Sequence, residues 1–180
     1  MNNGTNDTKL LEILRDFFFS GTQESIQLAY ETLKAMNNEE PNPTDWTEEE
    51  YCYNRLFVGP SAPQAPIVAS YYLELAQHYN GTVTSTIRNL YSAIGLRIPD
   101  GLNIPEDSLS IELDAYIFLM NKAEHNENAK ELAENFTALH LMEWLPLFIK
   151  KADRHDNTEA VAYVISTFRD WVESNSVNTY

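Results

Sequence analysis

Apolar residues recur along this chain at intervals of three and four positions over most of its length. That spacing is typical of α-helices with one buried face, because 3.6 residues complete each turn. The predicted buried faces are Leu10, Leu14, Phe17 and Phe18; Ile26, Ala29, Tyr30 and Leu33; Ile87, Leu90, Tyr91 and Ile94; Leu109, Leu113, Tyr116, Ile117 and Met120; and Val161, Val164, Ile165, Phe168 and Val172. No convincing alternating run bounded by hairpin turns is found. The sequence therefore predicts an all-α fold, a helical bundle.

Glycine and proline indicate where these helices begin and end. Gly59 stands where a helix should stop, since glycine readily adopts the left-handed conformation of many helix ends. Pro105 suits the first position of a helix, with Glu106 and Asp107 in a first turn whose dipole favours acidic side chains. The connection from Val58 to Pro66 is rich in proline and poor in charge. We expect a Gly-Pro hinge loop there, suited to the exchange of segments between two chains.

The length and composition predict one globular domain. At 180 residues the chain can bury a core without disulfides or metals, and we expect a single domain over 1–180, with frayed ends at 1–7 and 174–180. The one cysteine, Cys52, excludes an internal disulfide framework and favours the cytoplasm.

The chain is strongly acidic, with 12 Lys and Arg against 27 Asp and Glu, a net charge of −15. Such a surface repels nucleic-acid phosphates and anionic membranes, and it attracts basic partners. No uninterrupted apolar run approaches the ~20 residues that cross a bilayer. We therefore expect no nucleic-acid binding, no stable membrane insertion and a cytoplasmic location.

Motifs for catalysis are missing from the sequence. There is no P-loop, no Gly-x-Gly-x-x-Gly, no Gly-x-Ser-x-Gly and no His-Glu-x-x-His. His140 and Glu143 are three residues apart and could supply two metal ligands, although such a pair is more often a local hydrogen bond. We expect no catalytic residue, no metal site and no cofactor.

The stretch Leu56-Phe57-Val58-Gly59-Pro60, followed by Pro66, Ser70 and Tyr72, resembles the hallmark segment of the TorD/DmsD group of cytoplasmic chaperones. Later blocks resemble the same family in the same order. These blocks are residues 87–96, Pro105-Glu106-Asp107-Ser108 leading into Leu109 and Glu112, and His140-Leu141 with Trp144 and Phe148. Together they cover about half of the chain.

The resemblance implies a non-enzymatic helical chaperone for molybdenum-containing oxidoreductases. Such a protein binds the twin-arginine signal peptide of its partner apoenzyme and holds the partner until the molybdopterin cofactor is inserted. It then releases the partner for export by the Tat pathway. The family also tends towards domain-swapped homodimers, which the Gly-Pro hinge loop would permit.

A twin-arginine signal peptide is a basic pair followed by a moderately apolar stretch, so its receptor needs carboxylates beside an apolar groove. We expect Glu106, Asp107 and Glu112 to form the acidic rim. The full set of candidate peptide-binding residues is Tyr53, Leu56, Phe57, Gly59, Pro60, Pro66, Tyr72, Glu106, Asp107, Ser108, Glu112, His140 and Trp144. The competing explanation for the apolar residues is ordinary core packing. The competing explanation for the acidic residues is that they simply occupy the first turn of a helix.

The sequence departs from the family pattern in two places. Ser108 stands where the family usually has histidine, and Ile67-Val68 replace a proline and an aromatic residue. The loss of that histidine puts any ligand contact or pH role at this position in doubt.

Two other functions fit the same features. One is a helical adaptor for a different basic or amphipathic segment, and a related version is a nitrate-reductase-type assembly chaperone whose partner is not exported. A small helical enzyme would need a polar catalytic cluster, which the sequence does not offer.

Overall fold

The computed structural model describes residues 3–74, 81–99, 101–102 and 104–176. Most of these residues are helical, and the only extended pairing among them is an isolated antiparallel bridge. The all-α prediction is confirmed. The helices are α1 (Asn3–Phe19), α2 (Gln23–Met36), α3 (Trp46–Tyr53), α4 (Ala69–Leu73), α5 (Thr82–Ile94), α6 (Leu109–Ala123), α7 (Glu127–Phe136), α8 (Met142–Ala152) and α9 (Glu159–Ser176), with π-helical segments η1 (Asn54–Val58) and η2 (Thr137–Leu141).

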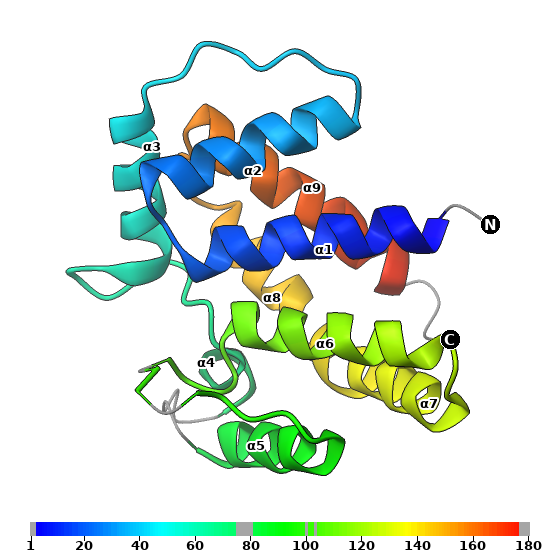
Figure 1. Ribbon diagram of the computed structural model, residues 1–180. Helices are drawn as coiled ribbons and strands as arrows, with labels where there is room; N and C mark the ends of the chain where they lie inside the picture. The colour runs from blue at the N-terminus through cyan, green and yellow to red at the C-terminus, as the bar shows by residue number, and fades with distance from the viewer. Residues whose placement is uncertain (1–2, 75–80, 100, 103, 177–180) are drawn as a thin grey trace.

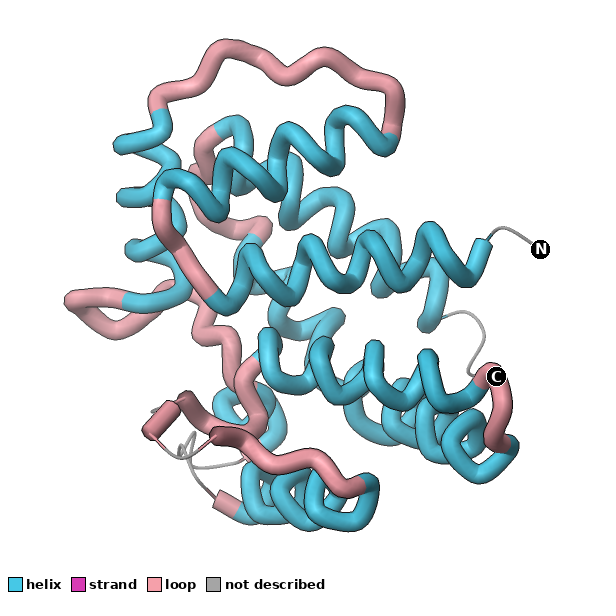
Figure 2. The backbone as a smooth tube through the Cα atoms, in the orientation of Figure 1, coloured by secondary structure: helices cyan, strands magenta, loops and turns pink. Residues whose placement is uncertain are grey.

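The helices pack around α1, which lies between α2 and α6 and contacts both (Figure 1). α9 packs on α2 and on α8, and α7 lies along α6. The short α4 contacts α8 and α5 at the lower edge of the view (Figure 1). The tube in Figure 2 shows that the α2–α3 connection arcs away from the helices as a long loop.

The core is rich in aromatic rings and continuous across the bundle. Phe18 lies at its centre, with ring centroids 5.0–5.7 Å from those of four other rings, Phe17, Phe57, Phe148 and Phe168. Such aromatic pairs contribute about 0.5–1.5 kcal/mol beyond the area that they bury. Because these rings come from α1, η1, α8 and α9, they fix the Gly-Pro segment to both the first and the last helix.

Two helical paths contain π turns. α3 continues directly into η1, and α7, η2 and α8 follow one another without a gap from Glu127 to Ala152. A π turn inserts extra backbone into a helix and is frequent at functional sites. Here η1 carries Leu56 and Phe57, and η2 carries His140, all three of which belong to the segments that resemble the chaperone family.

A buried carboxylate on α3 accepts hydrogen bonds from the backbone at the start of α9. Glu49 accepts the backbone N–H groups of Ala160 and Val161, each at 3.0 Å, and the hydroxyl of Thr158. The first backbone donors of a helix have no partner within that helix, so an acidic side chain at this point is stabilising. Glu49 therefore fixes α3 to α9.

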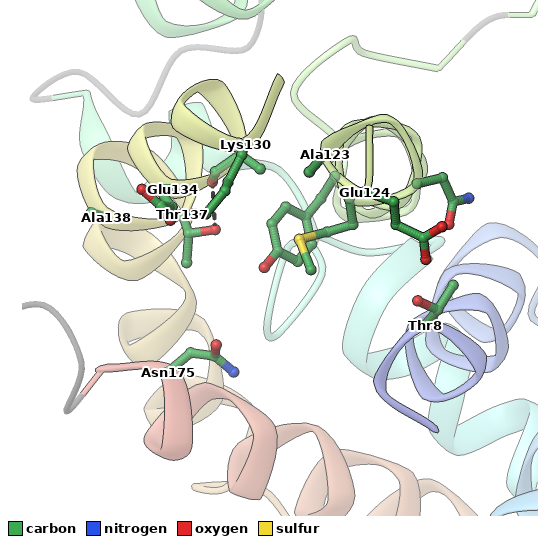
Figure 3. A pocket seen from close by; sticks show the side chains of 12 residues that line it. Thr8, Ala123, Glu124, Lys130, Glu134, Thr137, Ala138 and Asn175 are labelled. Carbon is green, nitrogen blue, oxygen red and sulfur yellow. Dashed lines mark hydrogen bonds between the residues drawn. The ribbon is translucent and has the colours of Figure 1, made fainter. Parts of the chain in front are cut away.

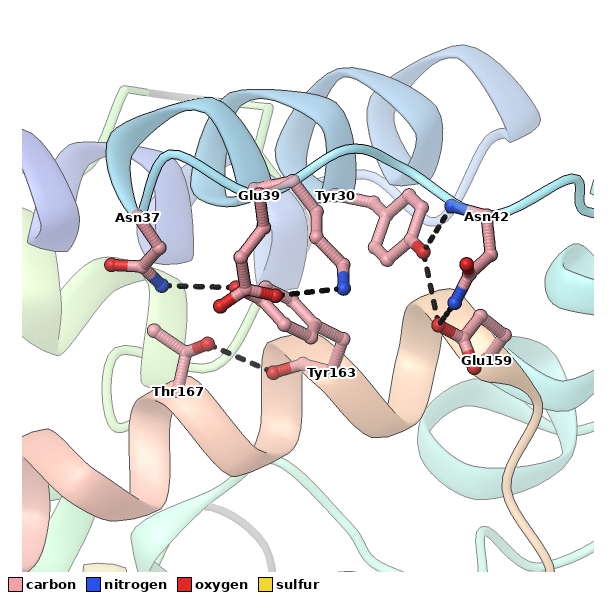
Figure 4. Close-up of polar contacts among 8 residues, drawn as sticks. Tyr30, Asn37, Glu39, Asn42, Glu159, Tyr163 and Thr167 are labelled. Carbon is pink, nitrogen blue, oxygen red and sulfur yellow. Dashed lines mark hydrogen bonds and ion pairs between the residues drawn. The ribbon is translucent and has the colours of Figure 1, made fainter.

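Polar contacts fasten the α2–α3 connection to α9 (Figure 4). The Tyr30 hydroxyl donates to Glu159 Oε1 at 3.0 Å and accepts the Asn42 N–H at 3.0 Å. Lys34 Nζ lies 2.9 Å from Glu39 Oε2 in the same region. These contacts therefore hold the long loop to α2 at Glu39 and Asn42, and they join α2 to α9.

Helices reach into both ends of the described chain, and the fraying predicted there stays a prediction. α1 begins at Asn3 and α9 extends to Ser176, within the ranges 1–7 and 174–180 that were predicted to fray. The Ser176 hydroxyl donates to the Val172 carbonyl at 2.8 Å, one turn back along α9. Trp171 and Val172 are buried and anchor that turn in the core. Residues 1–2 and 177–180 lie outside the described residues.

Candidate functional site

The Gly-Pro loop folds back on the π segment that precedes it. Gly59 has φ 123° and ψ −171°, a backbone conformation essentially restricted to glycine. A Cβ at this position would lie 2.8 Å from the Ser61 carbonyl oxygen. The Ala65 N–H donates to the Leu56 carbonyl at 2.7 Å and closes the loop. Glycine is therefore required for the geometry with which the chain leaves η1.

Beyond the loop, the chain crosses the start of α6 in an extended conformation. Val68 and Ser108 form an antiparallel bridge, and the Leu109 N–H donates to the Ile67 carbonyl at 2.9 Å. This pairing holds Ser108 extended, so α6 begins at Leu109. The expectation of a helix starting at Pro105 is wrong, because the residues from Pro105 to Ser108 form a turn ahead of it.

Asp107 is completely buried at this crossing and caps another helix. Its Oδ2 accepts the Ser70 N–H at 2.8 Å, and its Oδ1 accepts the Thr84 hydroxyl at 3.0 Å. Val68, which precedes α4, supplies no side-chain acceptor of its own. Asp107 therefore replaces the missing cap and joins α4 and α5 to the entry of α6.

Glu112 is a second fully buried carboxylate, on α6. Its Oε1 lies 2.7 Å from His140 Nε2, and its Oε2 accepts the Trp144 indole N–H at 3.0 Å. Burial raises the pKa of Glu112 and outweighs His140, which acts in the opposite direction. This network joins α6 to η2 and α8.

Aromatic rings surround this carboxylate network. Tyr72 of α4 stacks on Trp144, with ring centroids 5.7 Å apart and an interplanar angle of 28°. The His140 ring stacks on Phe136, with centroids 5.3 Å apart. The rings place α4 and α7 against the same network, so candidate residues from three sequence blocks meet in one region: Tyr72, Glu112, and His140 with Trp144.

The comparisons with known proteins decide the family. The sequence model of the family described as nitrate reductase delta subunit matches residues 20–150. The chain belongs to this family.

Curated relatives place the chain among the TorD-type chaperones. A chaperone protein TorD of Vibrio cholerae strain O395 is 28% identical over 148 residues, which cover 77% of this chain and 67% of the relative. A TorD of Vibrio cholerae strain M66-2 is 34% identical over 83 residues, covering 43% of this chain and 38% of the relative. The chain is a non-enzymatic chaperone of the TorD/DmsD family, whose members bind a redox-enzyme partner and assist its maturation.

The structure brings several of the predicted residues of this TorD-type chaperone together. Glu112, His140 and Trp144 share one hydrogen-bond network, and Tyr72 extends it by stacking. Tyr53 and Phe57 pack on each other, with ring centroids 5.0 Å apart, and both contact Phe17 of α1.

The expectation of an exposed rim and groove is wrong for most of these residues. The carboxylates of Asp107 and Glu112 are enclosed by donors, and the apolar side chains pack in the core. The buried candidates are Tyr53, Leu56, Phe57, Pro66, Asp107, Ser108, Glu112 and Trp144. In this conformation they support the surface rather than form it, and their part in peptide binding stays a prediction.

The other candidates reach the surface at least in part: Gly59, Pro60, Tyr72, Glu106 and His140. Glu106 Oε1 lies 2.6 Å from Arg88 Nε, and this contact lowers the pKa of Glu106. A basic peptide would therefore have to displace Arg88 to reach this carboxylate.

Sequence reasoning missed two residues of the region, Thr84 and Arg88. Thr84 lies three positions before Ile87 and seven before Tyr91, on the buried face of α5. A polar residue at an apolar position of that face was the available signal for a buried hydrogen bond. The ion pair between Arg88 and Glu106 had no comparable signal, because it joins residues of separate elements.

Proposed function

We propose that this chaperone binds the twin-arginine signal peptide of an apo-molybdopterin oxidoreductase in the cytoplasm and assists cofactor insertion before Tat export. The observation that carries the proposal is the family match over residues 20–150, which includes the Gly-Pro loop and the Glu112–His140–Trp144 network. The similarity to chaperones named TorD supports it.

The charge of the chain also supports this partner. A net charge of −15 attracts a leader that carries two arginines, and it disfavours nucleic acid and anionic lipid. An arginine guanidinium pairs with carboxylates through two parallel hydrogen bonds, which a lysine ammonium cannot form. Recognition of arginine rather than of positive charge alone is therefore the expected signature.

The buried carboxylates contribute by holding the scaffold. Asp107 ties α4 and α5 to the start of α6, and Glu112 ties α6 to η2 and α8. A signal peptide that binds on these elements would meet a surface whose shape is set in advance, which lowers the cost of ordering it.

Affinity capture with the full chain tests this function. The immobilised chain is incubated with lysate of its native host, and bound proteins are identified by mass spectrometry. The proposal predicts the catalytic subunit of a molybdopterin oxidoreductase with its twin-arginine leader intact. Failure to enrich any redox-enzyme subunit, against a column of unrelated acidic protein, contradicts it.

A second function is favoured by the description of the matching family, nitrate reductase delta subunit. In that case the partner is a reductase subunit that is assembled without export. The same capture distinguishes the two, because the bound subunit would lack a twin-arginine leader.

A further inference from the structure

A cleft of about 650 Å³ opens between α6 and α7, where the first turns of α1 and the end of α9 also meet. None of the residues that the sequence singled out as peptide-binding lines it. Figure 3 shows one wall formed by α7 and η2, with the end of α6 and α1 opposite and α9 below. The labelled lining residues are Lys130, Glu134, Thr137 and Ala138 on the first wall, Ala123, Glu124 and Thr8 opposite, and Asn175 on α9.

The interior of the cleft is largely apolar. Tyr116 and Ala133 are buried in its lining, and Met120 is 36% exposed there. Methionine adapts its shape to varied apolar partners because its side chain is flexible and polarisable. Several hundred cubic ångströms of such space accommodate apolar side chains of a bound segment.

The rim of the cleft is acidic. Glu124 and Glu134 lie on opposite walls and are exposed, and within the described part of the chain neither side-chain carboxylate forms a hydrogen bond or an ion pair. Lys130 also lines the cleft, but its Nζ lies 3.3 Å from Glu127 Oε1. Two carboxylates are thus available to a cationic partner, and the nearby cation is already paired.

The two walls of the cleft are held together by the buried network described above. Glu112 is on α6, the helix that carries Met120, and His140 is on η2, the segment that carries Thr137 and Ala138. The contact of 2.7 Å between Glu112 and His140 therefore joins the elements on either side of the cleft. The buried Glu112 carboxylate therefore helps to set the distance between α6 and η2 on the two sides of the cleft.

We propose that this cleft receives the signal peptide, with the arginine pair against Glu124 and Glu134 and the apolar stretch against the interior. Charge complementarity and the apolar interior favour this occupant over an acidic or wholly polar one. The inference rests on the proposed function, and it places the signal peptide on the α6–α7 face rather than at the Gly-Pro loop.

Fluorescence anisotropy with a labelled synthetic peptide tests the site. The peptide carries two consecutive arginines and an apolar run of about ten residues, and a second peptide has two lysines in their place. The rim variant is Glu124→Gln with Glu134→Gln. The matched control is Glu40→Gln with Glu48→Gln, which removes the same charge from exposed positions on the α2–α3 connection and α3. In Figure 1, α3 lies on the opposite side of the molecule from α7.

The rim variant should bind the arginine peptide roughly tenfold more weakly than the unmodified chain, and it should lose the preference for arginine over lysine. The control should stay within about twofold of the unmodified chain, since it leaves the cleft intact. Ala138→Trp, which fills the cleft from a partly exposed position, should weaken both peptides. Circular dichroism checks that each variant keeps its helical content.

The outcomes separate this site from the function. If the unmodified chain does not bind the arginine peptide, both the proposed function and this site are overturned. If it binds, and the folded rim and Ala138→Trp variants bind equally well, only the site is overturned. Sedimentation velocity tests the remaining case. If the unmodified chain is a dimer, and these substitutions dissociate it without changing peptide binding, the cleft binds a second copy of the chain and the proposed site is overturned.

Discussion

At the scale of single residues, two acidic side chains five positions apart have different structural tasks. Asp107 caps α4 and receives a hydroxyl from α5, whereas Glu112 receives an indole N–H and contacts an imidazole. Both are completely buried, so the surrounding donors must offset the cost of removing each carboxylate from water. Removing either carboxylate leaves buried donors without their acceptor.

Asp107→Ala should lower the free energy of unfolding by about 1–3 kcal/mol, because the Ser70 N–H and the Thr84 hydroxyl lose their acceptor. Urea denaturation followed by circular dichroism measures this loss. Glu40→Ala, at an exposed position, should change the value by less than about 0.5 kcal/mol. Equal effects of the two substitutions would contradict the capping role.

Glu112→Gln tests the raised pKa of the buried carboxyl. Because the pKa of Glu112 is higher in the folded state than in the unfolded state, ionisation of this carboxyl favours unfolding. The native chain therefore loses stability as the pH rises from 4.5, the ordinary pKa of a glutamate, through the raised pKa of the folded state. The glutamine variant lacks this titration. Its stability relative to the native chain should therefore increase with pH, as measured by urea denaturation of both proteins at successive pH values. A constant difference, or one of opposite sign, would contradict the assignment.

At the scale of elements, the Gly-Pro loop shows how local backbone geometry positions whole helices. Gly59 turns the chain out of η1, and the Ala65 N–H then returns it to Leu56, so that α4 can reach α8. Gly95 also has a positive φ, 80°, at the end of α5, but a Cβ there would meet nothing within 4 Å.

Gly59→Ala should therefore destabilise the fold more than Gly95→Ala does. The first substitution combines an unfavourable φ with a contact at 2.8 Å to the Ser61 carbonyl, and a loss of roughly 1–3 kcal/mol is expected. The second has only the left-handed backbone conformation, at about 1 kcal/mol. Thermal and urea unfolding of both variants give the comparison, and a larger loss at Gly95 would refute this reading of the loop.

The elements also show what the sequence could and could not predict. Helical periodicity identified buried faces of α1, α2 and α9, because each of these helices buries one side. The face predicted for α6 was incomplete, since Glu112 and Leu119 are buried as well, and the prediction that Met120 is buried is wrong, because its side chain is 36% exposed. The start of α6 could not be read from Pro105, since the bridge between Val68 and Ser108 decides it. The resemblance selected Glu112, His140 and Trp144 as peptide-binding residues, which stays a prediction; their shared network and their burial depend on packing between helices that no local pattern contains.

At the scale of the whole molecule, the chain is an acidic helical chaperone of the TorD/DmsD family with a continuous core. Among the residues that the structure describes, no helix is both long and apolar enough to cross a membrane. A single domain over 1–180 and exchange of segments through the 58–66 loop stay predictions. The net charge acts over the entire surface and should draw a cationic leader from a distance, with an effect that salt reduces.

The most direct test asks whether this acidic chaperone recognises an arginine-bearing leader. The unmodified chain is titrated calorimetrically with the arginine peptide and with the lysine peptide, each at ~0.05 M and ~0.5 M salt. We predict tighter binding of the arginine peptide at low salt, and a clear loss of affinity at high salt, because screening weakens contacts between exposed charges. Equal affinity for the two peptides, or no binding of either, would contradict the account.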